Sequence, residues 1–455
     1  MLVKGIFTDK KFSTQLVSLV LPIFLQTLLV NMLSILDMLM VGQLGEIEIA
    51  AVNISGRIIF FLQIFLFGVG STASIFVAQF MGKNDEKNVK KVVALSVAIG
   101  GVVALSLAGI IFFNSKAILR VLFTNNEAVL KIGSQYLRIL AFSLVFHSIN
   151  TIYISILRSM GEVKLPLWVN LMSFPLKIIL NYILIFDVLP IGGYGVIGAA
   201  IATIIIRITE SIFIGSLLVV KRKDLIIHIK DFSLISRDFI IRFFKIFSIL
   251  ITKDLIWAAG IVCYTGIYGK MGVGPVTVMG IQDTVQQIIM VFTYALNYAS
   301  LTMIGEKIGA KQYDVASEYG KKFMFITVTS SVCLSLLLIT CVPTIVTAFN
   351  ISTDTMTHAS YVLYVFAVFL PVISLNSILF SGILRSGSDN LFALIIDTIA
   401  VWVIGYTLMY LFGITKKVGI EGVFLCFAIS EVFKMIMALK RVRSNKWMSN
   451  IVEDI

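Results

Sequence analysis

ILRSMG (residues 156–161) and ILRSGS (residues 383–388) begin with the same four residues and lie 227 positions apart, half the length of this 455-residue chain. A shared tetrapeptide is weak evidence by itself, so other matches at the same offset decide its meaning. The glycines of VGQLG (41–45) fall on those of YGKMG (268–272) at that offset. The two stretches therefore belong to a longer register.

Further matches extend this register along the chain. Gly82 falls on Gly309 at the same offset of 227. GYGVIGAA (193–200) aligns with KVGIEGVF (417–424) at an offset of 224, which a short deletion explains. The chain is therefore an internal duplication of one structural unit.

Composition identifies the environment of the chain. Hydrophobic residues make up 58% of it and charged residues only 14%, far from the averages of soluble globular domains. Apolar stretches recur from end to end, and most reach the roughly 20 residues that a helix needs to cross the hydrocarbon core. The expected helices lie near residues 14–40, 48–78, 91–113, 135–157, 166–187, 193–220, 243–268, 276–305, 322–345, 360–384, 391–412 and 417–440. We predict an all-α integral membrane protein with twelve transmembrane helices.

The duplication divides these helices into two sets of six. We expect an N-terminal lobe at 1–220, a charged cytoplasmic linker at 221–245 and a C-terminal lobe at 246–455. Because six is even, each copy starts and ends on the same side, so the lobes are parallel repeats related by a pseudo-twofold axis normal to the membrane. Two such lobes can rock around a central site, which favours alternating-access transport over a channel.

The positive charge has a topological explanation. The formal net charge is +12. If the N-terminus is cytoplasmic and charges in the first or last three residues of a helix are counted with the adjoining loop, 25 of the 37 Lys and Arg fall in the termini and loops of that side, 6 in the opposite loops and 6 inside helices. This positive-inside bias predicts a multi-pass protein of the plasma membrane with both termini in the cytoplasm. No compact basic face with interleaved aromatic residues accompanies the charge, so nucleic acid is not an expected partner.

The cysteines and histidines do not have the spacing of a metal site or of a disulfide pattern. Cys263, Cys333, Cys341 and Cys426 lie in apolar stretches without metal-ligand spacing or a pairing pattern, and the three histidines fall in unrelated places. We expect no metal site and no cofactor. The sequence also has no His/Glu metal motif and no nucleophile elbow, so an intramembrane enzyme is not expected.

Ionisable residues inside apolar helices are candidates for function because burying a charge in the membrane is costly. Asp37 stands in NMLSILDMLMVG with no basic residue near it in sequence. Either it fixes its own helix through local hydrogen bonds, or its carboxylate takes up H⁺ or Na⁺. Asp254 is the acid that we take as its partner in the second half, and we give it a role in cation or substrate handling. Adjacent residues on a helix point about 100° apart, so Lys253 and Asp254 are not expected to pair with each other.

The sixth and twelfth predicted helices each carry an opposite-charge pair. Arg207 and Glu210 are three residues apart, as are Glu431 and Lys434, and the offset of 224 aligns the two pairs with their signs exchanged. At this spacing each pair can neutralise itself, so we interpret them as structural ion pairs. Asp397 in the eleventh helix is open to either a structural or a functional interpretation.

A polar strip marks the eighth predicted helix. Gln282, Asp283 and Gln286 fall within about one turn, where they either line a cavity or hold helices together by hydrogen bonds. We place these three in the substrate cavity. Its other predicted members are Gln26, Asn53 and Lys253.

Several motifs together resemble the multidrug and toxic compound extrusion (MATE) transporters of bacterial type. The resemblance covers nearly the whole chain, and it implies a two-lobed, twelve-helix antiporter that exchanges Na⁺ or H⁺ for lipophilic organic cations. The motifs are LPIFLQ, LDMLMVGQLG, ILRSMGEVKLP, NYILIF and GYGVIGAAIAT in the first half, and LIWAAGIVCYTGIYGKMG, IGEKIGA and ILRSGSDN in the second.

The resemblance assigns roles to matching residues. Asp37 matches the acid of the first helix that the family uses for cation coupling. Asp254 matches an acid found before the Trp of the seventh helix in one branch of the family. Thr203 matches a hydroxyl near the Na⁺ site of the first lobe.

Departures from the family pattern concern the same site. Where many members have Asn and then Asp four residues apart on the fifth helix, this chain has Lys177 and Asn181, and on the tenth helix it offers only Asn376 where some members have an acid. An ammonium in place of a carboxylate disfavours bound Na⁺ in the first lobe. Our hypothesis is that Lys177 is an internal counter-ion of Asp37, so that coupling uses H⁺ or Asp254. The alternative is a lipid-facing Lys177 that snorkels to the interface.

Two other transporter classes remain as alternatives. A major-facilitator transporter also has two parallel six-helix halves, but its basic Asp-Arg motif is absent from FMGKNDEKNVKKV (80–92). A flippase of lipid-linked precursors or polysaccharides, from the same superfamily as the MATE proteins, is nearer, although those commonly carry fourteen helices. The expected partners are small-molecule substrates and membrane lipids, and we expect a monomer.

Overall fold

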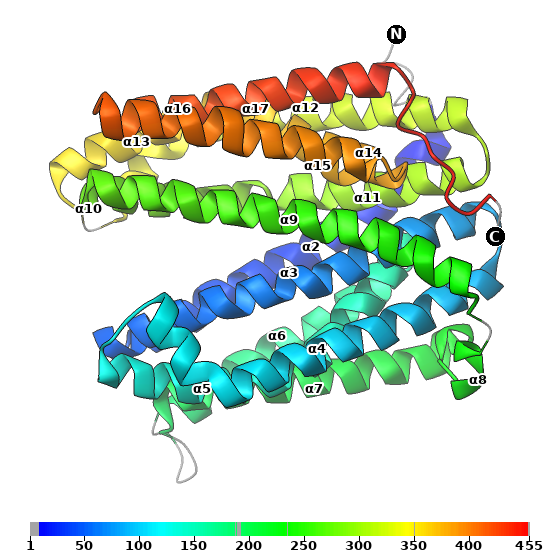
Figure 1. Ribbon diagram of the computed structural model, residues 1–455, viewed down its shortest axis with the longest axis horizontal. Coiled ribbons are helices and arrows are strands. Elements are labelled where there is room, and N and C mark those ends of the chain that lie inside the picture. The colour runs from blue at the N-terminus through cyan, green and yellow to red at the C-terminus, as the bar shows by residue number, and fades with distance from the viewer. Residues whose placement is uncertain (1–8, 187, 189–192, 234, 350, 454–455) are drawn as a thin grey trace. The chain divides into compact units, whose positions relative to one another are not determined.

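The computed structural model describes residues 9–186, 188, 193–233, 235–349 and 351–453, and every regular element in them is helical (Figure 1). The helices of the first half are α2 (Lys10–Gly42), α3 (Glu46–Gly82), α4 (Glu86–Leu122), α5 (Glu127–Ser159), α6 (Lys164–Ile185) and α7 (Gly195–Lys221). A short 3₁₀ turn, η1 (Lys223–Leu225), and α8 (Ile229–Phe232) lie in the linker.

The second half is more interrupted. Its elements are α9 (Arg237–Met271), α10 (Val273–Ile289), α11 (Val291–Gly309), α12 (Tyr313–Thr347), α13 (Thr353–Ile378), η2 (Leu379–Ile383), α14 (Leu384–Ser386), α15 (Asn390–Thr398), η3 (Ile399–Tyr406), α16 (Thr407–Tyr410), η4 (Leu411–Thr415) and α17 (Ile420–Arg443). The elements η2, η3 and η4 are π-helical turns inside two continuous spans, Thr353–Ser386 and Asn390–Thr415.

The predicted membrane spans are confirmed. In the described part of the chain, 11 helices are long and apolar enough to cross a membrane, and the bent pair α10 and α11 makes up to 12. Polar caps set several helix starts: Asp85 accepts a hydrogen bond from the Asn88 backbone N–H, and Asn126 from those of Ala128 and Val129. These side chains satisfy backbone donors that the first helical turn leaves without partners.

One span is bent where the sequence predicts a continuous helix. The axes of α10 and α11 differ by 48° at Met290, with neither Pro nor Gly at the break. Polar contacts with α13 accompany the bend: Thr293 Oγ1 donates to Ser374 Oγ at 3.3 Å, and Asn297 Nδ2 donates to Ser377 Oγ at 2.8 Å. These contacts join α11 to α13, so tertiary hydrogen bonds accompany a bend that local propensity does not predict.

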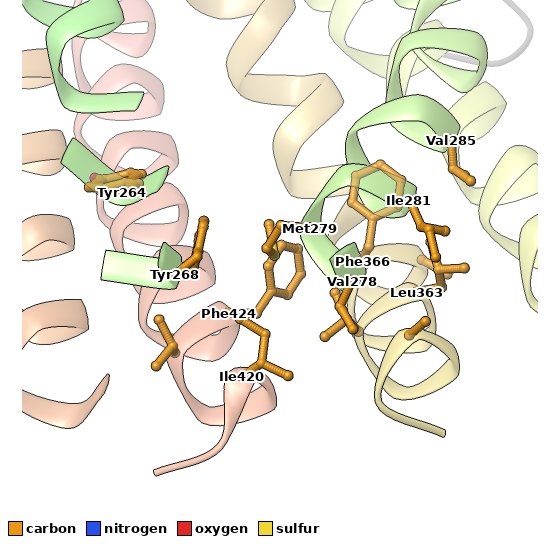
Figure 2. Packing of buried hydrophobic residues seen from close by; sticks show 14 of the residues in the cluster. Tyr264, Tyr268, Val278, Met279, Ile281, Val285, Leu363, Phe366, Ile420 and Phe424 are labelled. Carbon is orange, nitrogen blue, oxygen red and sulfur yellow. The ribbon is translucent and has the colours of Figure 1, made fainter. Parts of the chain in front are cut away.

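The chain packs as two compact units. One unit contains Leu25–Phe247, and the other contains Met1–Phe24 and Ser248–Ile455. We call Leu25–Phe247 the first unit and the other the second unit. A large apolar cluster forms the core of the second unit. Figure 2 shows side chains of α9, α10, α13 and α17 meeting in this cluster, among them Tyr264, Met279, Phe366 and Phe424. The first unit has smaller clusters, including one around Leu130, Leu137 and Leu144 of α5. The pseudo-twofold relation of the lobes stays a prediction.

Candidate functional site

Asp37 is held by two side chains of α6. The ammonium of Lys177 forms an ion pair and hydrogen bond with Asp37 Oδ2, and Asn181 Nδ2 donates to Asp37 Oδ1 at 2.6 Å. Lys177 and Asn181 are four residues apart, so they lie on one face of α6 and reach the same carboxylate. Lys177 therefore does not snorkel to the interface, and the structure brings it to Asp37 as the hypothesis requires.

These contacts leave the Asp37 site electrically balanced. Both carboxylate oxygens accept from α6, and the ammonium lies where a bound cation would otherwise neutralise the acid. Thr203 of α7 donates its hydroxyl to the carbonyl of Ala199, one turn earlier in its own helix, at 2.9 Å. Asp37, Lys177 and Asn181 thus form an internal hydrogen-bonded set, whereas the Thr203 hydroxyl is bound within its own helix.

Gln26 joins three segments of the first half. Its Oε1 accepts from Arg158 Nε at 3.0 Å and from the Arg158 Nη2 at 2.7 Å, and its Nε2 donates to the Val163 carbonyl at 2.7 Å. Gln26 is fully buried. The prediction that it lines the substrate cavity is corrected, because both ends of its amide hold α2 against the end of α5 and the turn that follows. Asn53 is exposed on α3.

The Arg207–Glu210 pair is present and has a third member. Arg207 Nη1 donates to Glu210 Oε2 at 2.9 Å. Asn150 of α5 donates Nδ2 to the Arg207 carbonyl at 3.1 Å and to Glu210 Oε2 at 3.2 Å, and its Oδ1 accepts from Ser211 Oγ at 2.7 Å. The pair is therefore neutral, hydrogen-bonded and tied to a neighbouring helix.

The second half carries a longer chain of buried charges. Lys253 Nζ of α9 lies 3.0 Å from Asp254 Oδ1 and 3.5 Å from Asp397 Oδ2 of α15. Lys434 Nζ of α17 lies 2.7 Å from Asp397 Oδ1 and 3.4 Å from Glu431 Oε1. We call Asp254, Lys253, Asp397, Lys434 and Glu431 the second-half network. Acids and ammonium groups alternate along it, as the burial of charge requires.

The network ends on an asparagine whose contacts resemble those of Asn150, although the two lie 226 rather than 227 positions apart. Asn376 Nδ2 of α13 donates to Glu431 Oε2 at 2.8 Å and to the Glu431 carbonyl at 2.7 Å. Glu431 aligns with Arg207 at the offset of 224. In both halves an asparagine thus binds the backbone carbonyl at the same repeat position and a carboxylate beside it.

The π-helical turns η2 and η3 begin shortly after Asn376 and Asp397, and such turns are frequent at functional sites.

Two expectations about Lys253 are wrong. Lys253 and its sequence neighbour Asp254 do pair, because the four-carbon lysine side chain spans the angle between adjacent helix positions. Lys253 was also predicted in the substrate cavity, but it is buried with its ammonium between two acids. Asp254 is the more accessible partner, with a side chain that is 24% exposed.

The polar strip on α10 divides between two faces. Gln282 is buried, and its Nε2 donates to Gln286 Oε1 at 2.8 Å. Asp283 is exposed. The two glutamines therefore bind each other along one face, whereas Asp283 is exposed, and the place of all three in a substrate cavity stays a prediction.

The repeat register also corrects the partner of Asp37. Tyr264, not Asp254, stands 227 residues after Asp37, and its hydroxyl donates to the Val401 carbonyl at 2.7 Å. Both residues tie the first helix of a repeat to its fifth.

The sequence does not decide whether Asp397 is structural or functional, although an acid in the middle of an apolar helix is expected to have a charged or hydrogen-bonding partner. The position of this acid in the sequence does not identify Lys253 and Lys434 as its partners.

Comparison with known proteins identifies the family. The MatE family model matches residues 22–183 and again 255–411, which together are more than half of the chain. The transporter YisQ of Bacillus subtilis (strain 168), which is named as uncharacterized, is 25% identical over 440 residues that cover 97% of this chain and 96% of YisQ. The probable multidrug resistance protein NorM of Bacillus cereus is 24% identical over 442 residues, 94% of each chain.

Solved structures share the fold. A crystal structure of MATE in the bent conformation superposes with a TM-score of 0.86 at 19% identity, covering 95% of this chain and 96% of the other. A MOP superfamily transporter from Pyrococcus furiosus, described as having a binding pocket of reverse polarity, gives the same TM-score, identity and coverage. An outward-facing multidrug resistance MATE transporter gives 0.85 at 20% identity over 95% and 96% of the two chains. The chain is a multi-pass membrane transporter and belongs to the MATE family.

Proposed function

We propose that this transporter is an antiporter that exports lipophilic organic cations in exchange for protons. Relatives named as probable multidrug resistance proteins along 94% of the chain support the export of such compounds. In this proposal the lobes at 1–220 and 246–455 alternate access around a site between them, joined by the linker at 221–245. The protein acts as a monomer in the plasma membrane with both termini in the cytoplasm.

The charge balance of the two halves supports a coupling site in the second half. Asp37 is matched by Lys177, and Glu210 by Arg207. The second-half network has three carboxylates and two ammonium groups, so with all groups ionised it keeps one negative charge. A buried group of residues with one unmatched negative charge is stabilised by one monovalent cation, whereas a balanced pair is not. This difference carries the proposal that coupling occurs in the second half.

Asp254 is the entry point to the network in this proposal. It stands at one end of the charge chain, and its side chain is 24% exposed, against 6% for Asp397. Lysine ammonium groups separate the three carboxylates, so their oxygens are not gathered on one side as a Na⁺ ion would need. A proton needs only one oxygen. We therefore propose H⁺ as the ion and Asp254 as its first acceptor.

Dye efflux from proteoliposomes tests this function. Wild type, Asp37→Asn and Asp254→Asn proteins are compared with a lipophilic cationic dye under an imposed H⁺ gradient, and under a Na⁺ gradient at constant pH. The expected result is H⁺-driven efflux in wild type that is lost in Asp254→Asn. Efflux that follows the Na⁺ gradient at constant pH and survives in Asp37→Asn contradicts proton coupling.

A lipid or lipid-linked substrate is the second candidate. A lysine stands at a position of the first half where the resemblance implies asparagine, and a structural neighbour from Pyrococcus furiosus is described as having a pocket of reverse polarity that suggests a different function. An ammonium near the substrate path attracts anionic headgroups rather than organic cations. If neither gradient moves any dye, and a fluorescent anionic lipid is translocated instead, this second function replaces the first.

A further inference from the structure

Each repeat is followed by a segment that folds back on its own compact unit. In the first unit this segment is residues 222–233 of the linker, which contain η1 and α8. In the second unit it is residues 444–453, which follow α17. We call the two segments the linker strap and the tail strap. Each strap belongs to the same unit as the helix that it follows.

The turn that ends the repeated ILRS stretch is a docking point in each half. Met160 stands in this turn in the first half, and its sulfur accepts from Arg222 Nη2 of the linker strap at 3.9 Å. Gly387 stands 227 residues later, and its carbonyl accepts from the Ser449 backbone N–H of the tail strap at 3.1 Å. Two segments of different sequence therefore dock at one repeat position.

The start of the third helix of each repeat is the second docking point. The ammonium of Lys90 in α4 lies 3.1 Å from Asp231 Oδ2 of the linker strap. Ser317 of α12 stands 227 residues after Lys90, and its hydroxyl donates to Asn445 Oδ1 of the tail strap at 3.1 Å. Because both docking points recur at the offset of 227, the straps are a repeated element of the fold.

Charged contacts hold the linker strap. In addition to the pair of Lys90 with Asp231, Arg222 Nη1 lies 3.6 Å from Glu162 Oε1. The side chains of Lys90 and Glu162 are 28% and 44% exposed, so water and salt ions reach both pairs. Leu225 adds a buried apolar side chain. Exposed ion pairs are weak and are screened by salt. The charged contacts of this strap should therefore weaken as the ionic strength rises.

Apolar burial and a close backbone contact hold the tail strap. Trp447 and Val452 are fully buried. A Cβ atom at Gly387 would lie 2.1 Å from the Trp447 carbonyl oxygen, so the strap approaches the turn as closely as only glycine allows. The strap also forms an ion pair, between Lys311 and Glu453 at 2.5 Å. The burial of apolar surface does not depend on charge screening, so this strap should stay docked when salt weakens the pair.

From this difference we propose that the linker strap is an ionic latch, which detaches from α4 and from the turn at Met160 as the ionic strength rises, while the tail strap stays docked. The latch goes beyond the proposed function, because it needs neither a substrate nor a coupling ion. With the linker in the cytoplasm, as we propose, the salt concentration of the cytoplasm sets the docked fraction of this strap.

Hydrogen exchange of the purified full-length protein in detergent tests the latch. Amide protection is measured at about 0.02 M and about 0.5 M NaCl, between which the Debye length falls from about 20 Å to about 4 Å. Protection of residues 222–233 should fall about fivefold at high salt, the most that one exposed ion pair contributes. Protection of residues 444–453 should not change. An unstructured peptide at the same salt concentrations corrects for the effect of salt on the intrinsic exchange rate.

Matched variants identify the ion pairs that are responsible. Lys90→Met should lower the protection of the linker strap at low salt toward its high-salt value. Lys87→Met should not, although Lys87 is an exposed lysine one turn earlier on α4. Arg222→Gln and Lys223→Gln form the second matched pair, and the loss is expected only for Arg222→Gln. Trp447→Ala should open the tail strap at both salt concentrations, which shows that the measurement detects release.

Three results overturn the proposal. The first is protection of residues 222–233 that is the same at both salt concentrations. The second is a loss at high salt that is equally large in residues 444–453. The third is a salt dependence that is undiminished in both Lys90→Met and Arg222→Gln. If Lys90→Met does not fold, Arg222→Gln decides alone, because Arg222 and Glu162 form a separate ion pair.

Discussion

Lys434 lies closer to Asp397, at 2.7 Å, than to its own helix neighbour Glu431, at 3.4 Å. The pair that the i,i+3 spacing predicts is therefore one part of a larger network, and Asp397 is the residue that joins its two lysines. Substitution of this acid should therefore lower the stability of the protein more than substitution of any other member of the network.

Asp397→Asn should destabilise the protein by about 3–5 kcal/mol, because it removes the one carboxylate that lies between the two buried ammonium groups and is shared by both. Thermal unfolding in detergent, followed by tryptophan fluorescence, measures the loss. Asp254→Asn is the control at the accessible end of the network and should have a smaller effect. Equal losses in the two variants would contradict the central position of Asp397.

Loss of the Asn150 or the Asn376 side chain should cost a similar amount of stability, because each donates to the backbone carbonyl at the same repeat position, Arg207 or Glu431, and to a nearby carboxylate. Substitution of either by leucine leaves these buried acceptors with one partner fewer, at a cost of about 1–3 kcal/mol. Unfolding midpoints of the two variants give the comparison. A large loss in one half and none in the other would show that the equivalence is only geometric.

Lys177→Asn should release Asp37 from its ammonium and restore an amide at a position where the resemblance implies one. We expect the variant to gain Na⁺ stimulation of dye efflux at constant pH, because the acid then lacks its internal counter-ion. Lys177→Arg keeps the positive charge and should remain insensitive to Na⁺. Stimulation of the arginine variant to the same degree would rule out charge as the cause.

Asp9 accepts hydrogen bonds from Lys322 Nζ at 2.7 Å and from the Phe12 backbone N–H at 3.0 Å, and these contacts should be insensitive to pH over the physiological range. The hydrogen bond from Lys322, with that from the Phe12 backbone, holds the pKa of the Asp9 carboxyl below its ordinary value. An acid whose pKa is lowered by folding stabilises the fold above its unfolded pKa, and this contribution is lost as the pH falls through the folded value. The difference in unfolding temperature between wild type and Asp9→Asn should stay constant from about pH 8 to pH 5 and shrink below about pH 4. A difference that changes between pH 8 and pH 5 would assign the titration to another group.

The helices and the duplication could be read from the sequence because both depend on local or repeated features. Apolar stretches long enough to span the membrane have one stable solution in lipid, the helix, and all the predicted spans are found in the described residues. The bend at Met290 was missed because it accompanies contacts of Thr293 and Asn297 with α13. No local signal encodes those partners.

Ionisable residues in apolar helices were likewise visible in the sequence, because each must find a partner or a function. The sequence by itself determined that Asp37, Lys177, Lys253, Asp254 and Lys434 are charged residues inside apolar helices of a duplicated membrane protein. Only the tertiary structure decided the pairing: Lys177 with Asp37, and Lys253 and Lys434 on either side of Asp397. The physical reason is that hydrophobicity and helix periodicity act along the chain, whereas the choice of a charge partner depends on distances between helices that are far apart in sequence.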